Sequence, residues 1–173
     1  MKKGGFKRKY LPEFVYGGID GTVTTFAVVS GVMGASLSSS IVLILGFANL
    51  FADGFSMAVS NYLSTKSRNE LNIHDGKNPR RTALATFVAF ITIGFIPLVS
   101  FVLAIIVKNK YLISNQFVFS FILTAISLFV IGYLKGEVTG KHKFISSIET
   151  LAIGGIAALV AFFVGFFIKG LIG

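Results

Sequence analysis

Two aspartates, Asp20 and Asp53, lie inside stretches of sequence that are otherwise apolar. An ionised carboxylate at the centre of a membrane helix costs roughly 3 kcal/mol, so it normally faces a bundle interior or a water-filled cavity, where it binds ions or carries protons. The structural alternative is a protonated aspartate that hydrogen-bonds a neighbouring helix. These two carboxylates are therefore the first candidates for chemistry.

A polar stripe surrounds the second aspartate. Asn49, Asp53 and Met57 are spaced four residues apart, so they share one face of a helix. Asp20 and Thr24 have the same spacing on the preceding helix. Methionine is also a common filler of apolar cores, so only its register with the aspartates makes Met57 a candidate ligand.

The depths of these residues can be estimated from the nearest cationic positions. Asp20 lies about 16 Å of helix from Lys9, and Met57 lies about 13 Å from Lys66. Asp53 is one turn deeper than Met57. A carboxylate beside a thioether suits a borderline-soft transition metal better than Na⁺ or Ca²⁺. A carboxylate removed from water also exchanges protons near neutral pH, so competition between metal and proton predicts antiport.

The elements that position these residues are predicted to be transmembrane helices. Of the 173 residues, 54% are hydrophobic and 13% are charged, whereas soluble domains carry about 25% charged residues. We expect one all-α membrane domain over residues 1–173, with five spans of about the length that a bilayer requires. The expected spans are 14–34, 39–63, 82–107, 115–134 and 148–168.

The distribution of cations predicts the orientation. With the N-terminus in the cytoplasm, 13 of the 16 Lys and Arg residues lie on the cytoplasmic side, as the positive-inside rule requires. The C-terminus then lies outside. Topology and anionic lipid account for the net charge of +9, so the lipid bilayer is the expected partner and nucleic acid is not.

Glycines surround the first aspartate. Gly17, Gly18 and Gly21 flank Asp20. Small residues let membrane helices approach one another closely, and a cluster of them can also distort a helix. Close packing is the simpler interpretation.

Four further polar residues are candidates for a cytosolic entrance: Glu13, Glu70, His74 and Asp75. Glu70 and His74 are four residues apart and would hold a metal if their segment were helical. The glycine and proline that follow favour a solvated loop instead. Cysteine is absent, so we expect no disulfide, haem attachment or zinc knuckle and no covalently bound cofactor. The intramembrane carboxylates indicate an ion path, so we expect a protein that is not an enzyme.

Several motifs resemble the vacuolar iron transporter family. They are GGIDGTVTTFAVVSG, ADGFSM and YLSTKS in the first two helices, and KGEVTGKHKF in the last hairpin. The resemblance covers nearly all of residues 13–165. Plant-type members can carry a glutamate where this chain has Asn49, whereas its second carboxylate is Asp53, one turn away. The predicted loop 66–81 is too short for the family's cytosolic metal-binding domain, so the chain resembles a minimal form.

The resemblance implies a five-helix homodimer that exports cytosolic Fe²⁺ or Mn²⁺ in exchange for H⁺. It also implies that Asp20 and Met57 form the intramembrane metal site, with Asp53 and Asn49 further along the path. The minimal size implies the cytoplasmic membrane of a prokaryote. Two alternatives remain open: a passive channel for protons or cations, and a membrane packing or interaction protein that transports nothing.

Overall fold

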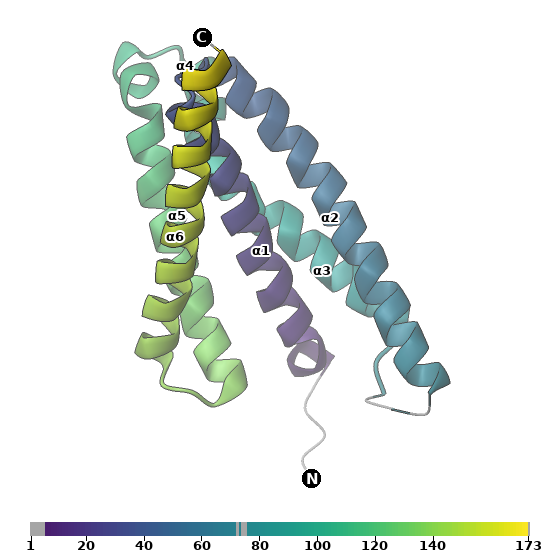
Figure 1. The fold of residues 1–173 in the computed structure, drawn as a ribbon. Helices are drawn as coiled ribbons and strands as arrows, with labels where there is room; N and C mark the ends of the chain where they lie inside the picture. Colours follow the sequence, from purple (N-terminus) through teal and green to yellow (C-terminus); the bar gives the residue numbers. More distant parts are fainter. Residues whose placement is uncertain (1–5, 72, 74–75, 173) are drawn as a thin grey trace.

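Helices make up almost the whole chain in a computed structural model that describes residues 6–71, 73 and 76–172 (Figure 1). Among these residues there is no β-strand, which confirms the all-α prediction. The elements are α1 (Phe6–Gly34), α2 (Ser39–Glu70), α3 (Pro79–Gly94), the 3-10 helix η1 (Ile96–Leu98), α4 (Val99–Val107), α5 (Lys110–Thr139) and α6 (Lys143–Ile172).

Most of these helices are suited to cross a membrane. In the described part of the chain, four segments are long and apolar enough to do so: α2, the combined segment Pro79–Val107, α5 and α6. Helix α1 is a fifth long helix, of 29 residues, and its apolar sequence is interrupted by Glu13 and Asp20. The expected polytopic membrane fold is confirmed, and the chain is an integral membrane protein.

The helices extend further than the predicted spans. Helix α2 continues to Glu70, so the predicted loop 66–81 shrinks to residues 71–78. Helix α5 likewise continues to Thr139, where Gly140 ends it with a positive φ of 69°. The prediction ended each span at the first charges, but lysine and glutamate are good helix formers. A 30-residue helix is about 45 Å long, so its charged ends project beyond the hydrocarbon layer.

The third span is not the single helix predicted over 82–107. It breaks after Gly94 into η1 and then α4. Pro97 explains the break, because proline has no N–H to donate and disfavours helical geometry in the preceding residue. The carbonyl of Pro97 accepts a hydrogen bond from Ser120 Oγ on α5 at 2.6 Å, which satisfies a backbone group that lipid could not satisfy.

The long segments alternate in direction, so the predicted cationic segments gather at one end. In Figure 1 the start of α1, the α2–α3 connection and the α5–α6 turn lie together at the lower end. The α1–α2 turn and the C-terminus lie at the upper end. We call the lower end cytosolic, following the charge bias.

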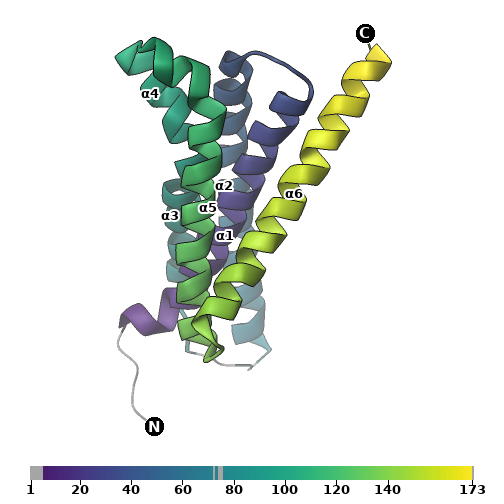
Figure 2. The same cartoon turned by 90° about the vertical axis from the view of Figure 1, so that its left-hand side faces the viewer.

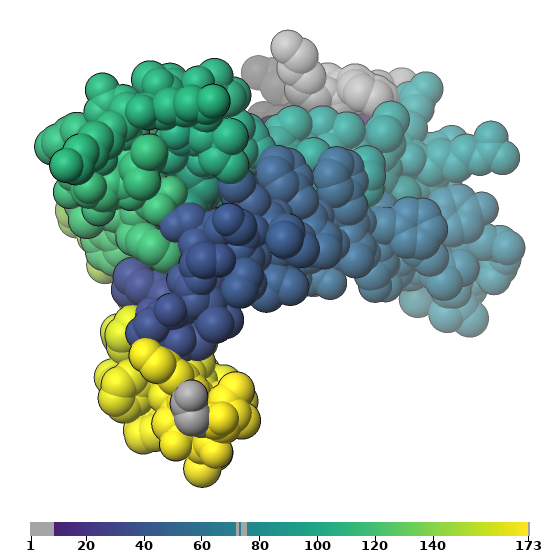
Figure 3. All heavy atoms as spheres, turned by 90° about the horizontal axis from the view of Figure 1, so that it is seen from above, coloured from purple at the N-terminus to yellow at the C-terminus, as the bar shows by residue number. Residues whose placement is uncertain are grey.

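Helix α1 is the centre of the bundle, since it contacts α2, α3, α5 and α6. Figure 2 shows α6 diverging from α5 toward its C-terminal end, where Gly165 still packs closely against Gly31 of α1. Figure 3, seen from above, shows that end protruding beside the α1–α2 turn. An apolar core stabilises the bundle near its upper end, formed by Phe26, Val29, Val32, Val42, Leu98 and Phe101.

Candidate functional site

Close backbone packing fixes how α1 is oriented. A Cβ atom added at Gly17 would lie 2.5 Å from the carbonyl oxygen of Thr86, and one at Gly21 would lie 2.5 Å from that of Phe90. The glycine face of α1 therefore lies directly against α3. Helix α1 is continuous through this region, so the glycines serve packing and do not distort the helix. Asp20 lies on the flank of this face and is half-buried.

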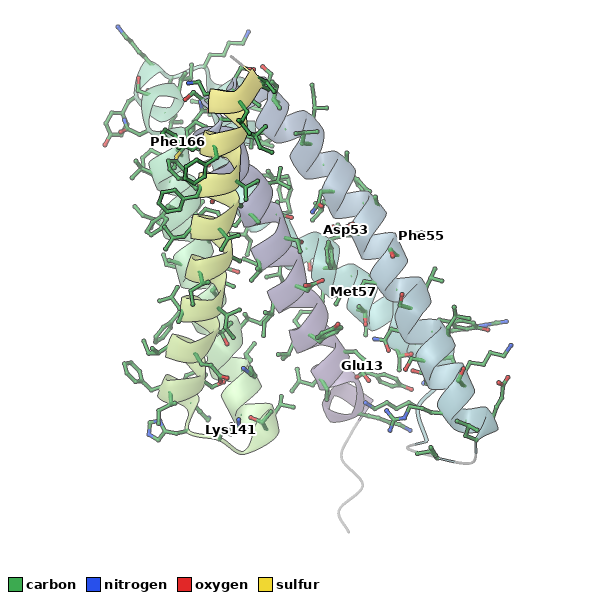
Figure 4. All side chains as sticks on the ribbon, viewed as in Figure 1. Glu13, Asp53, Phe55, Met57, Lys141 and Phe166 are labelled. Carbon is green, nitrogen blue, oxygen red and sulfur yellow. The ribbon has the colours of Figure 1, made fainter. Side chains whose placement is uncertain are left out.

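Hydrogen bonds fix the cytosolic half of α2 against the same helix. Asn61 Nδ2 donates to Thr86 Oγ1 at 2.5 Å, and the hydroxyls of Thr65 and Thr82 lie 3.1 Å apart. Helices α1 and α2 each contact α3 more extensively than they contact each other. The two helices consequently diverge toward the cytosolic end and leave a groove between them (Figure 4).

The cytosolic half of this groove contains a hollow of about 380 Å³, which we call the cytosolic hollow. It is lined by Pro12, Glu13 and Tyr16 of α1 and by Met57, Ser60, Asn61 and Ser64 of α2. Figure 4 shows Glu13 and Met57 in this part of the groove. The lining combines carboxylate, thioether, amide and hydroxyl groups. These groups include both hard and soft ligands, as a borderline transition metal prefers.

A second hollow of about 610 Å³ lies nearer the upper end and is called the distal hollow. Asn49 and Asp53 line it together with apolar residues of α1 and α2. Asp53 is exposed on the single chain. The side-chain nitrogen of Asn49 is buried, and no hydrogen-bond partner for it lies within the described residues. Both hollows lie between α1 and α2, and each is lined by residues of the predicted polar stripe.

Asp20 lies on α1 between the residues of that helix that line the cytosolic hollow and those that line the distal hollow. Its backbone carbonyl accepts a hydrogen bond from Thr24 Oγ1 at 2.8 Å. Among the residues described, no three His, Cys, Asp or Glu side chains gather closely enough to hold a metal. One chain therefore spreads its candidate ligands along the groove, and their joint role in metal binding stays a prediction.

The four candidates for a cytosolic entrance do not lie together at one site in the described structure. Glu13 lines the cytosolic hollow. Glu70 is the last residue of α2, where it is exposed and lies 3.8 Å from Lys66. It was predicted in a loop, and its helical position is a correction. His74 and Asp75 lie outside the described residues.

The structure adds two groups to the cytosolic hollow that were not predicted as ligands, and it places a lysine beside Glu13. Tyr16 and Asn61 line it directly, and both had a sequence signal, since each is four residues from a predicted ligand. Lys77 lies 2.5 Å from Glu13 Oε1. No sequence pattern indicates this contact, because the two residues are far apart in the chain.

Comparison with known proteins places the chain in a family. A sequence model described as the VIT family matches residues 11–77 and 68–166. The chain belongs to the VIT family. The two matched segments overlap at residues 68–77, around the end of α2 and the α2–α3 connection, which is where the metal-binding domain was expected to be missing.

Relatives from distant eukaryotes match over most of their length. The chain is 24% identical to "Vacuolar iron transporter" of Plasmodium berghei, covering 94% of this chain and 83% of the relative. It is 26% identical to "Vacuolar iron transporter 1" of Arabidopsis thaliana, covering 87% and 82%. The first alignment extends over 227 positions, more than the 173 residues of the chain. That relative therefore has segments without a counterpart here. The names are those of transporters, in agreement with a non-enzymatic protein.

Proposed function

We propose that the protein transports divalent metal, with Fe²⁺ and Mn²⁺ as substrates, out of the cytosol in exchange for protons. The observation that carries the proposal is the groove between α1 and α2. It offers Glu13 and Met57 in the cytosolic hollow and Asn49 and Asp53 in the distal hollow. Asp20 lies between them. Two relatives named as vacuolar iron transporters support the same substrate class.

The exposed polar face of α2 supports a homodimer. Asp53 is exposed together with Ser56 and Ser60. A carboxylate in contact with lipid is unfavourable by roughly 3 kcal/mol or more. A second copy that covers this face removes the penalty, and a two-fold axis would bring two sets of candidate ligands together. Ligands that are too few in one chain would then suffice in two.

The carboxylates also provide the coupling. A metal ion and protons compete for the same acidic groups, so binding of one releases the other. Release on the far side, followed by protonation of Asp20 and Asp53, would return the empty transporter with protons as counter-ions. The direction follows the charge bias, which places the cytosolic hollow on the cytoplasmic side. In a prokaryote this membrane would be the cytoplasmic membrane.

The test is metal flux into proteoliposomes, with and without an opposing pH gradient. Wild type should move Fe²⁺ and Mn²⁺ faster when protons flow in the opposite direction, and Asp20→Asn should abolish the flux. Glu149→Gln is the matched control, because this carboxylate lies outside the groove and lies 3.1 Å from Lys135.

Two results would contradict the proposal. Flux that ignores the pH gradient and follows the electrochemical gradient of the metal alone would indicate a passive channel. No flux from folded wild-type protein would indicate a membrane packing or interaction role.

A further inference from the structure

The short α2–α3 connection is tied to the first turns of α1. The ammonium group of Lys9 donates a hydrogen bond to the backbone carbonyl of Gly76. The ammonium group of Lys77 donates one to the carboxylate of Glu13. The backbone N–H of Asn78 donates one to the hydroxyl of Tyr10, at 3.2 Å. The connection therefore lies beside the mouth of the cytosolic hollow, with the ammonium group of Lys77 directed at Glu13.

The ion pair between Lys77 and Glu13 is close and well shielded. Lys77 Nζ lies 2.5 Å from Glu13 Oε1, and the two side chains are only 19% and 11% exposed. The other carboxylate oxygen, Oε2, is buried and has no hydrogen-bond partner within the described part of the chain. A shielded carboxylate that loses its cation is strongly destabilised. Glu13 thus requires a nearby cation, and only one of its two carboxylate oxygens is engaged within the described residues.

The groups around Glu13 suit a metal better than they suit an ammonium ion. Met57 lines the same hollow and supplies a thioether. Asn61 also lines it, and its Nδ2 is engaged by Thr86 Oγ1, which leaves the amide oxygen available. A thioether is a soft ligand that selects transition metals, whereas a lysine ammonium offers only hydrogen-bond donors. Metal and ammonium cannot both neutralise Glu13 Oε1.

We propose that Lys77 is a tethered counter-cation at the metal-capture position, and that cytosolic metal binds Glu13 by displacing it. This inference rests on the proposed function and adds a determinant of affinity to it. The lysine keeps Glu13 neutralised when metal is scarce and raises the concentration at which metal binds. Displacement also separates the ammonium group of Lys77 from Glu13, so metal binding changes the surroundings of a residue in the α2–α3 connection.

Direct binding of Mn²⁺ to purified protein tests this without transport. Free Mn²⁺ is counted by electron paramagnetic resonance for wild type, Lys77→Gln and Lys77→Arg. We expect Lys77→Gln to bind about tenfold more tightly, a factor equivalent to about 1.4 kcal/mol, and Lys77→Arg to resemble wild type. The matched control is Lys66→Gln, which removes the same charge from an exposed pair at the same end and should change affinity less than about twofold. Adding Glu13→Gln to Lys77→Gln should abolish the gain.

A second measurement uses wild type alone and does not depend on how the variants fold. Acylation of lysines, quantified by mass spectrometry, should increase severalfold at Lys77 when Mn²⁺ saturates the protein and stay constant at Lys66. Mn²⁺ binding with unchanged labelling of Lys77 would overturn this inference and leave the proposed function standing. A gain in affinity that persists without Glu13, or that Lys66→Gln reproduces, would also overturn it. Wild type that binds no Mn²⁺ would overturn both proposals.

Discussion

The groove between α1 and α2 and the hairpin of α5 and α6 both carry acidic side chains, but they differ in whether lysine neutralises them. In the hairpin each glutamate lies 3.1 Å from a lysine, Glu137 from Lys143 and Glu149 from Lys135. In the groove, Asp20 and Asp53 have no lysine or arginine within salt-bridge distance among the described residues. Nearby lysines neutralise the two hairpin glutamates, and Lys77 does the same for Glu13 at the cytosolic end of the groove. Asp20 and Asp53 remain available to a mobile cation.

Both regions use glycine to bring helices close together. On α1, Gly17 and Gly21 bring the backbone of α3 within contact, which fixes the orientation of the helix that carries Asp20. In the hairpin, a Cβ atom at Gly132 would lie 2.7 Å from the Cα of Ser147, whereas one at Gly155 would meet no atom within 4 Å. The two regions therefore differ in how their charges are paired and not in how closely their helices pack.

The largest expected effect on metal binding comes from neutralising two carboxylates of the groove at once. Asp20→Asn combined with Asp53→Asn should abolish Mn²⁺ binding, because loss of ligands or their support typically costs 10–100-fold in affinity for each site. Glu137→Gln combined with Glu149→Gln should leave binding within about twofold, since exposed ion pairs contribute little. Equal losses in the two double variants, measured by Mn²⁺ titration, would remove the distinction between the regions.

Added methyl groups should distinguish a glycine in close helix contact from one in open space. Gly21→Ala forces a Cβ to 2.5 Å from the Phe90 carbonyl oxygen, and such overpacking typically costs about 1–3 kcal/mol. Gly155→Ala enters open space and should be neutral or slightly stabilising. Thermal unfolding in detergent measures both. A melting temperature for Gly21→Ala equal to that of Gly155→Ala would show that α1 is not held by this contact.

The fold was largely predictable because hydropathy and charge patterns respond directly to the membrane. Met57, Asn49 and Asp53 were correctly predicted to share one face, since helical periodicity determines which residues align. The break at Pro97 had a visible signal that the hydropathy pattern overrode. Contacts between distant segments had none: the pair of Glu13 and Lys77 depends on where a short connection lies after the helices have packed.

Replacing the thioether should change selectivity more than overall activity. Met57→Leu keeps the volume of the side chain but removes the soft ligand. We expect roughly tenfold weaker uptake of Fe²⁺ and a smaller loss for Mn²⁺, which prefers oxygen ligands. Competition between the two metals in proteoliposomes measures the ratio. An unchanged ratio would assign Met57 to packing alone.

The smallest effect is expected in the hairpin. Lys135→Met removes the partner of Glu149, whose side chain is 48% exposed. Because exposed ion pairs contribute about 0–1 kcal/mol, thermal stability and metal flux should both stay close to wild type. A large loss of flux would show that the α5–α6 charges take part in transport.

Simultaneous recording of metal and proton movement tests the central claim most directly. Proteoliposomes carrying one dye for metal and one for internal pH would be exposed to external Mn²⁺. We predict that metal entry is accompanied by proton exit in wild type and in Glu149→Gln, and that Asp20→Asn abolishes both movements. Metal entry that persists with unchanged proton exit in Asp20→Asn would contradict the assignment of the groove carboxylates to the ion path.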